Sequence, residues 1–356
     1  MPQIYSTVVN HQYKMPVPLY FKVTLAFVWR AAKFQTSVST EAMSMSSAAL
    51  KKKALISDPV EPAVTPPPHL GDTHFLTRPK IAPRSRKREL PEGLWAKCPK
   101  CRELIYDKEL DDNLKVCVKC GYHFAISARE RIHSLVETCS FEEMDSQMES
   151  VDVLKFTGPA SYEAKLAAYR RKSPLLKDAV VTGIGRIGPH RVALGVMDFS
   201  FLGGSMGSVV GEKLTRLIEA GTNQRLPVVI ISTSGGARMY EGMFSLMQMA
   251  KTCGALAYHA QSRLPYISVL TDNTYAGVIA SFATVGDVIL AEPEAEIGFA
   301  GARVIKDTTQ AELPPGFQTA EFLQKHGLID AIVSRNEMKS KLIRFLHFLL
   351  KNPTQR

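Results

Sequence analysis

Four cysteines at fixed spacing constrain the fold of this chain more than any other feature of its sequence. Cys98 and Cys101 form one C-x2-C pair, and Cys117 and Cys120 form a second pair after fifteen intervening residues. Each pair suits a tight turn that presents two thiolates, and a hairpin between the pairs would bring all four together. We therefore expect one structural Zn2+, because a closed four-thiolate shell leaves no position for a substrate. His123 is not expected to bind the metal, since the shell is already full.

The two remaining cysteines and the distribution of charge narrow the class of protein. Cys139 and Cys253 stand alone, so the cysteines do not form a disulfide framework in a chain of 356 residues, and a reducing compartment is expected. Residues 1–97 carry 14 basic and 6 acidic side chains, whereas the rest of the chain carries 30 and 28. A nucleic-acid binder is expected to carry a basic face on its folded module. Nucleic-acid binding is therefore not expected, and the 6 basic and 5 acidic residues of 97–120 agree.

Residues 1–93 have the composition of a disordered extension. They contain the proline-rich stretch PVEPAVTPPPH and the basic run RSRKRE, with few apolar repeats. Up to about residue 57 this arm is rich in Ser and Thr and nearly free of acids, which is also typical of an organellar transit peptide. Both interpretations stay open, as does translation from an upstream Met. No apolar run reaches the roughly 18–20 residues of a membrane span, and the best candidate, VPLYFKVTLAFVW, is interrupted by Lys22.

Strands and helices are expected to alternate along the remaining chain. Helices are expected at SARERIHSLVE, where Ser127 is a suitable N-cap, and at YEAKLAAYRRK. From about residue 178, two strands are followed by alternating helices and strands, which predicts an α/β domain with a buried sheet. In order, the expected segments are strands DAVVTGIGRIG and HRVALGVMDF, helix VVGEKLTRLIEAG, strand PVVIIST, a long helix over 238–262, strand YISVLT, helix AGVIASFAT, strand DVILAE, and helices FQTAEFLQKHG and NEMKSKLIRFLHFLLKN.

Two glycine motifs resemble nucleotide-binding sequences but lack the required context. GIGRIG, residues 183–188, matches G-x-G-x-x-G, yet a second strand follows it where a dinucleotide site needs a helix. We interpret it as a hairpin turn. GSVVGEKLT, which begins at Gly207, does not have the G-x-x-x-x-G-K-[ST] spacing of a P-loop.

GGSMG, residues 203–207, supports an alternative function. It matches G-x-S-x-G and lies between an expected strand and an expected helix. Ser205 would then be the nucleophile of a serine hydrolase, with Asp272 or Asp287 as the acid and His326 as the base.

A glycine pair, Gly235-Gly236, occupies the next strand-to-helix junction in the stretch STSGGARM. Glycines there let the backbone approach a ligand closely and turn both N–H groups toward it. With the positive end of a helix dipole, such a pair can hold a developing oxyanion without any side chain. Close packing of the helix on the sheet is the structural alternative.

Several motifs in a fixed order resemble one family. They are the cysteine ribbon, DFSFLGGSMGSVVGEK, STSGGARM, SLMQMAK, LPYISVLTD, SFATVGDVILAEPEAEIGFAGARVI and LPPGFQTAEFL. From about Leu94 to its C-terminus, the chain resembles the carboxyltransferase β subunits of multi-subunit bacterial and plastid acetyl-CoA carboxylases. The resemblance implies a zinc ribbon (94–125) followed by a crotonase-like (ClpP/crotonase) α/β spiral domain (126–356). The arm that its composition predicts to be disordered (1–93) lies outside the resemblance.

The resemblance also implies a reaction and the residues that serve it. The family moves a carboxyl group from carboxybiotin to acetyl-CoA and forms malonyl-CoA for fatty acid biosynthesis. The backbone N–H groups of Gly235 and Gly236 would then face an enolate oxygen. The remaining expected substrate contacts are the glycines that line the CoA-side cleft and two basic candidates for CoA phosphate or helix-terminus contacts, for which a solvated face is the alternative: Gly203, Gly204, Gly207, Lys213 and Arg238.

Partners are expected on the same grounds. A biotinylated Met-Lys-Met tripeptide is absent, and no convincing ATP site occurs, so biotin carboxylase and the biotin carboxyl carrier protein would be separate chains. The family pairs its β subunit with an α subunit in an α2β2 core. The Met-rich stretch 239–251 is apolar on most faces, so it is expected either to contact that α subunit or to be buried in its own domain. The location would be a bacterial cytoplasm, or a plastid stroma if residues 1–57 are a transit peptide.

One segment departs from the family pattern. Where the family has a Pro-Thr-x-Gly-Gly type of sequence, this chain has Asn273 in place of the proline and Ala276 in place of the first glycine. If that position needs a positive φ, Ala276 introduces strain.

Overall fold

The structure, a computed structural model, describes residues 94–158, 160–310 and 312–350. The arm expected at 1–93 lies outside the described residues. The ribbon comes first: β1 (Trp95–Lys97) pairs antiparallel with β2 (Leu104–Tyr106), and the short helix α3 (Asp107–Asp112) follows. Its core is small, and it contains Ile105 and Leu110 together with Cys98 and Cys117. A module with so few apolar side chains needs a metal or a neighbouring domain to hold its fold.

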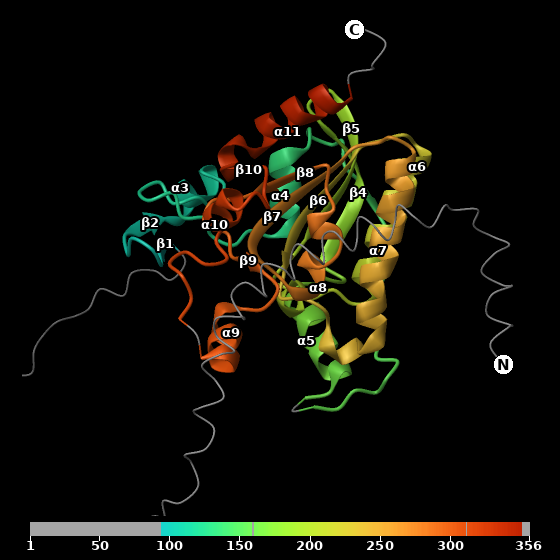
Figure 1. Cartoon of the computed structure of the whole chain (residues 1–356), viewed down its shortest axis with the longest axis horizontal. Coiled ribbons are helices and arrows are strands. Elements are labelled where there is room, and N and C mark those ends of the chain that lie inside the picture. The colour runs from blue at the N-terminus through green and yellow to red at the C-terminus, as the bar shows by residue number, and fades with distance from the viewer. Residues whose placement is uncertain (1–93, 159, 311, 351–356) are drawn as a thin grey trace, which may run out of the picture. The chain divides into compact units, whose positions relative to one another are not determined.

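The large sheet runs in the order β10-β8-β7-β6-β5-β4-β3, with β9 paired to β7 (Figure 1). β4 is antiparallel to both of its neighbours, β3 and β5, and the strands from β5 to β10 are parallel. The GIGRIG turn is the β4–β5 hairpin, in which Ile187 pairs with His190, so the hairpin interpretation is confirmed. The strand bounds are β3 Glu142–Met144, β4 Val180–Ile187, β5 His190–Met197, β6 Val228–Ser234, β7 Tyr266–Tyr275, β8 Val288–Ala291, β9 Ile297–Gly298 and β10 Ala331–Ile332.

Helices cover both faces of this sheet. α6 packs on β4 and β5 with α7 beside it, and α4 and α11 pack on the same strands from the other face (Figure 1). The α/β class predicted from the alternation of elements is therefore confirmed. The α-helices are α4 Ala128–Leu135, α5 Tyr162–Lys172, α6 Ser208–Asn223, α7 Met243–Gln261, α8 Ala276–Ile279, α9 Ala302–Thr309, α10 Ala320–Lys325 and α11 Arg335–Leu349; the 3-10 turns are η1 Leu202–Gly204, η2 Met239–Glu241 and η3 Phe282–Thr284.

Some boundaries differ from the sequence predictions for local reasons. The long helix was expected from residue 238, but α7 begins at Met243, because η2 intervenes and Gly242 has φ 52°. The expected helix over AGVIASFAT is split into α8 and η3 by Ser281, whose ψ of −118° is not helical. α4 does begin after Ser127, which forms a full capping box with Glu130.

A buried ionic cluster joins the ribbon to the large domain. Arg335, at the start of α11, donates through Nη1 to the carbonyls of Leu114 and Phe124, at 3.0 and 2.9 Å. Its Nη2 pairs with Glu292 at 2.8 Å, and Arg131 of α4 reaches the same carboxylate at 2.6 Å. Burial alone would raise the pKa of Glu292, but the two guanidinium groups lower it instead. We call Arg131, Glu292 and Arg335 the ribbon cluster.

Candidate functional site

The four ribbon cysteines converge as their spacing predicts. Their Sγ atoms all lie within 4.8 Å of one another. Cys98 Sγ is 3.6 Å from Cys120 Sγ, and Cys101 Sγ is 3.8 Å from Cys117 Sγ. Four sulfurs about 2.3 Å from a tetrahedral zinc ion would lie about 3.8 Å apart. The donor set and its geometry therefore fit a structural Zn2+.

His123 lies beside this group without joining it. Its Nε2 accepts the backbone N–H of Arg335 at 3.2 Å, on the side of the ribbon that faces the large domain. Burial lowers the pKa of this imidazole, which suits a neutral acceptor. The histidine therefore helps to dock the ribbon, and the metal-ligand group found among the described residues consists of the cysteines alone.

The two glycine loops lie side by side at the carboxyl ends of β5 and β6. The Gly235 N–H donates to the Gly203 carbonyl at 2.8 Å, and the Met206 N–H donates to the Gly236 carbonyl at 2.8 Å. The Arg238 N–H then donates to the Met206 carbonyl at 2.9 Å. Sequence analysis placed both loops in one site, and these three backbone bonds bring them together.

Gly236 needs to be a glycine. Its φ is 117°, which L side chains rarely adopt, and a Cβ built there would lie 2.6 Å from the Cβ of Ala276. Its N–H donates to the Ser234 hydroxyl at 3.0 Å. Both N–H groups of the glycine pair therefore already have acceptors inside the protein. A ligand oxygen would have to displace the Gly203 carbonyl or the Ser234 hydroxyl to bind them, so the oxyanion role stays a prediction.

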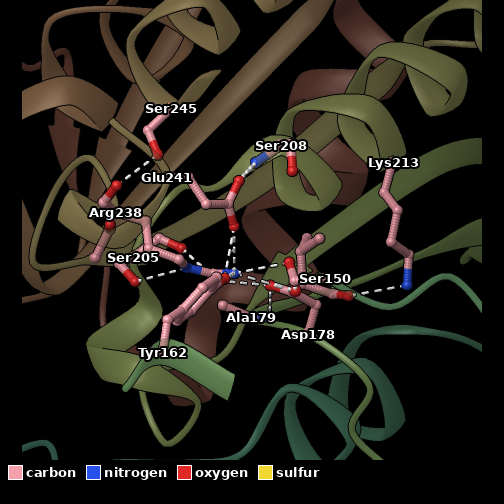
Figure 2. Close-up of polar contacts among 12 residues, drawn as sticks. Ser150, Tyr162, Asp178, Ala179, Ser205, Ser208, Lys213, Arg238, Glu241 and Ser245 are labelled. Carbon is pink, nitrogen blue, oxygen red and sulfur yellow. Dashed lines mark hydrogen bonds and ion pairs between the residues drawn. The ribbon is translucent and has the colours of Figure 1, made fainter. Parts of the chain in front are cut away.

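Lys213 and Arg238 were predicted to contact a CoA phosphate or a helix terminus, with a solvated face as the alternative. In the structure both side chains lie inside the domain (Figure 2). Lys213 is 2% exposed because α6 is packed against the sheet, and its Nζ donates to the Val180 carbonyl at 3.1 Å. Burial lowers the pKa of this ammonium. The side chain of Arg238 is 0% exposed and pairs with Asp178 at 2.6 Å. In this arrangement neither cation is open to a phosphate.

The serine hydrolase alternative requires a base next to Ser205. The Ser205 hydroxyl instead accepts from Arg238 Nε at 3.1 Å, and a guanidinium remains protonated and cannot take a proton. Asp272 accepts the backbone N–H of Glu296, and Asp287 accepts that of Tyr266. The G-x-S-x-G match thus lacks the chemistry of a nucleophilic serine, and the alternative is dropped.

Residues 273–276, the segment that departs from the family pattern, form the end of β7 and the first residue of α8. Ala276 has φ 48°, so the position does need the left-handed conformation in which alanine is strained. Tyr275 donates to Glu296 at 2.7 Å next to it. Because Ala276 touches Gly236, the strained residue borders the glycine pair directly.

Helix α7 has an unusual distribution of side chains. The residues it buries against its own domain are mostly polar: Ser245, Gln248, Thr252, Leu256 and His259. Large apolar side chains of η2 and α7 are exposed instead, among them Met239, Met243, Phe244, Leu246 and Met247. The alternative of burial in its own domain is therefore wrong for these side chains. Met239, Met243 and Met247 recur at intervals of four residues, and exposed apolar side chains gathered in this way are typical of an interaction site.

Two carboxylates and their companions were missed by sequence reasoning. Asp178, just before β4, and Glu241, in η2, both contact Arg238. Ser150 and Tyr162 complete the group. Only the Arg-x-x-Glu spacing of Arg238 and Glu241 was a local signal, because the other partners are 60 or more residues away in sequence.

Within residues 94–158, 160–310 and 312–350, none of the helices combines the length and the hydropathy that a membrane span requires.

Comparisons with known proteins agree with this architecture. Residues 126–346 match the carboxyl transferase domain family, and residues 95–120 match the acetyl-CoA carboxylase zinc finger domain. The chain is 58% identical over 272 residues to the acetyl-coenzyme A carboxylase carboxyl transferase subunit beta of Methylacidiphilum infernorum, covering 76% of this chain and 98% of that protein. It is 53% identical over 262 residues to the subunit of the same name from Desulforamulus reducens, covering 74% and 90%.

Among solved structures, the chain is similar to a transcarboxylase 12S crystallised with methylmalonyl-coenzyme A and methylmalonic acid. The TM-score is 0.54 at 25% identity, and the match covers 63% of this chain and 42% of that one. Together with the family match, this likeness confirms the predicted class, a crotonase-like α/β domain preceded by a four-cysteine ribbon.

Proposed function

This chain belongs to the carboxyl transferase family, and from that premise we propose that it is the β subunit of an acetyl-CoA carboxyl transferase. The reaction moves a carboxyl group from carboxybiotin to the methyl carbon of acetyl-CoA and forms malonyl-CoA. The two relatives described above, both named as this subunit, align over nearly their whole lengths.

The observation that carries the proposal is the glycine turn between β6 and α7. By the hydrogen bonds of the described residues, the turn contacts backbone groups and the Ser234 hydroxyl, not a carboxylate, an imidazole or a thiol. Such a turn suits a reaction in which the protein mainly binds, orients and stabilises a developing oxyanion. Carboxybiotin, when bound, supplies the carboxyl group, and its released ureido nitrogen can serve as the base.

Gly235 and Gly236 are assigned to the enolate oxygen of acetyl-CoA. Their N–H groups donate to the Gly203 carbonyl and the Ser234 hydroxyl. A serine hydroxyl can rotate away at little cost, which makes the Gly236 N–H the easier donor to release. Gly203, Gly204 and Gly207 form the adjoining wall on the CoA side.

The exposed apolar face of η2 and α7 is assigned to an α subunit that carries the carboxybiotin side of the site. Burying the apolar side chains of this face against a partner would be favourable, because removing apolar surface from water is worth about 25 cal/mol per Å2. Val151, Val153 and Leu154 are exposed as well, and Leu154 lies beside Gly242, so the apolar surface extends beyond the helix. An α2β2 core, a biotin carboxyl carrier protein and a biotin carboxylase complete the proposed assembly. A bacterial cytoplasm, or a plastid stroma, is the proposed location.

The test is an assay of the reverse reaction, malonyl-CoA-dependent carboxylation of free biotin. The chain is purified alone and co-expressed with an α subunit, and its mass in solution is measured in both cases. We expect activity only in the assembly. A monodisperse monomer that is fully active by itself would contradict the split site.

A further inference from the structure

The Arg238 side chain is completely enclosed, and every nitrogen of its guanidinium has a partner (Figure 2). Nη2 donates to Asp178 Oδ1 at 2.6 Å and to the Ser205 carbonyl at 2.8 Å. Nε donates to the Ser205 hydroxyl at 3.1 Å. Nη1 donates, at 2.9 to 3.3 Å, to Ser150 Oγ, Tyr162 Oη, Asp178 Oδ2 and Glu241 Oε1. We call Ser150, Tyr162, Asp178, Arg238 and Glu241 the loop cluster.

The carboxylates of this cluster are both ordered by further donors. Burial alone would raise the pKa of Asp178, but the charge and hydrogen bonds of Arg238, aided by Ser150 and the Ala179 N–H, hold it below its usual value. Glu241 accepts from Tyr162 through Oε1 and from the first N–H of α6, that of Ser208, through Oε2, each at 2.6 Å. The cluster is therefore a rigid support that reaches from β4 to the start of α6.

Loop 203–207 rests directly on this support. Arg238 holds both the carbonyl and the hydroxyl of Ser205, between the two backbone bonds that Gly203 and Met206 make to the glycine pair. Two residues further on, a Cβ at Gly207 would lie 2.5 Å from Glu241 Oε1 and 2.9 Å from Arg238 Nη1. The loop could not approach the cluster so closely with any larger residue at position 207.

We infer that Arg238 is a positioning residue for the proposed carboxyl transfer: it holds loop 203–207 in register with Gly235-Gly236, so that the N–H groups of the glycine pair keep their direction. It does this from beneath the site and contacts no substrate. Without its guanidinium, the Ser205 carbonyl loses its donor and two buried carboxylates lose their counter-charge. Loop 203–207 can then shift relative to Gly235-Gly236. A displacement of about 1 Å at a reacting centre costs about 10²-fold in rate.

The experiment compares Arg238→Lys with Arg335→Lys in the full chain assembled with its α subunit. The control fits closely, because Arg335 is also a buried, carboxylate-paired arginine but belongs to the ribbon cluster. Lysine keeps the charge and loses the planar set of donors. For Arg238→Lys we expect kcat to fall about 10²-fold, as for a displacement of about 1 Å, with KM for malonyl-CoA nearly unchanged and faster hydrogen exchange in 203–207. For Arg335→Lys we expect faster exchange near 114–124 and a nearly unchanged kcat.

Equal losses of kcat in the two variants overturn the inference. So does an effect of Arg238→Lys that is confined to a higher KM, since that would mean that Arg238 contacts the substrate. The inference rests on the proposed function for its kinetic readout only. If the wild-type assembly transfers no carboxyl group, the proposed function fails, and unchanged exchange of 203–207 in Arg238→Lys would then overturn the positioning role separately.

A milder variant covers the case in which Arg238→Lys does not fold. Ser205→Ala removes the acceptor of Arg238 Nε and leaves the ion pair with Asp178 intact. The bond from Arg238 Nη2 to the carbonyl of residue 205 remains, so loop 203–207 is loosened only in part and we expect a roughly tenfold lower kcat at an unchanged KM. A kcat equal to that of the wild type overturns the inference.

Discussion

The loop cluster and the ribbon cluster are built from the same chemistry and hold different kinds of structure. In the loop cluster one guanidinium serves two carboxylates and its remaining donors hold one short loop. In the ribbon cluster two guanidiniums share Glu292, and the spare donors of Arg335 hold two carbonyls of a separate module. Buried ion pairs often add little net stability against apolar replacements, because desolvation offsets attraction. The clusters differ in what is held by the arginine N–H groups that do not pair with a carboxylate: loop 203–207 in one case and the ribbon in the other.

The ribbon contains the four-thiolate donor set of a structural zinc site, whereas the glycine loops contain none of the metal-ligand groups found among the described residues. Of the changes considered, removal of Zn2+ should therefore destabilise the chain most. This destabilisation should be confined to the ribbon and should leave the glycine loops folded. Structural zinc is worth about 10–16 kcal/mol in isolated zinc-finger peptides. With Cys117→Ser or a strong chelator, we expect residues 95–125 to lose their hydrogen-exchange protection while 203–207 and 235–238 keep theirs. Freshly purified protein without zinc by elemental analysis would refute the metal assignment.

The second prediction removes the shared carboxylate of the ribbon cluster. Glu292→Gln leaves two buried guanidiniums without a counter-charge, and breaking a buried pair in this way costs about 3–5 kcal/mol. The sign of the pH dependence follows from the lowered pKa of Glu292. The folded chain binds fewer protons than the unfolded one, so this stability is complete above the unfolded pKa of about 4.3 and is lost as the pH falls further.

Urea unfolding between pH 3 and pH 7 measures this effect. The free energy of unfolding of the wild type should fall more steeply toward acid than that of Glu292→Gln. Parallel curves for the two proteins would show that Glu292 does not contribute to acid sensitivity.

The third prediction affects the glycine loops and spares the ribbon. Gly236→Val forces a β-branched side chain into φ 117° and against Ala276. The N–H of residue 236 then changes direction, and losing one oxyanion donor costs about 10²–10³ in rate. Carboxyl transfer should fall by that factor, with the zinc content unchanged. A folded variant with normal turnover would remove the oxyanion assignment.

The smallest expected effect is a gain. Ala276 adopts a left-handed conformation that costs an L residue about 1–2 kcal/mol, and glycine gives back roughly 0.5–1 kcal/mol of this as extra chain entropy in the unfolded state. Ala276→Gly should therefore stabilise the chain by about 0.5–1 kcal/mol, seen as a higher midpoint in thermal unfolding. A lower midpoint would mean that the methyl contact with Gly236 matters more than the strain.

Local signals explain what could be predicted from the sequence. Cysteine spacing, the glycine junctions, the Ser127 cap and the β4–β5 hairpin each depend on residues close together in the chain. The alternation of strands and helices predicted the α/β class, and the family resemblance then supplied the crotonase-like fold, which no single motif could have identified. The bounds of α7 and the division between α8 and η3 depend on individual backbone angles at Gly242 and Ser281, for which the sequence carries only a weak preference.

The two clusters could not be predicted, because their members meet only in the folded chain. Arg131 and Glu292 are 161 residues apart, and Asp178 and Arg238 are 60 apart. From sequence, Arg238 and Lys213 are ordinary surface cations, and burial of such residues is rare. The expectation that they would face a phosphate follows the usual behaviour of the residue type, whereas the structure encloses both.

The exposed apolar side chains of η2 and α7 make the free subunit sensitive to oxidation. Met239, Met243 and Met247 are 74%, 66% and 56% exposed. Thioethers in this position are open to oxidants, and a methionine sulfoxide is polar and poorly suited to an apolar contact. Oxidation would therefore fall first on chains that have not yet met a partner and would lower their fitness to join one. A cell that made this subunit in excess would accumulate unassembled chains with oxidised methionines. Assembly would protect these methionines from oxidation by burying them.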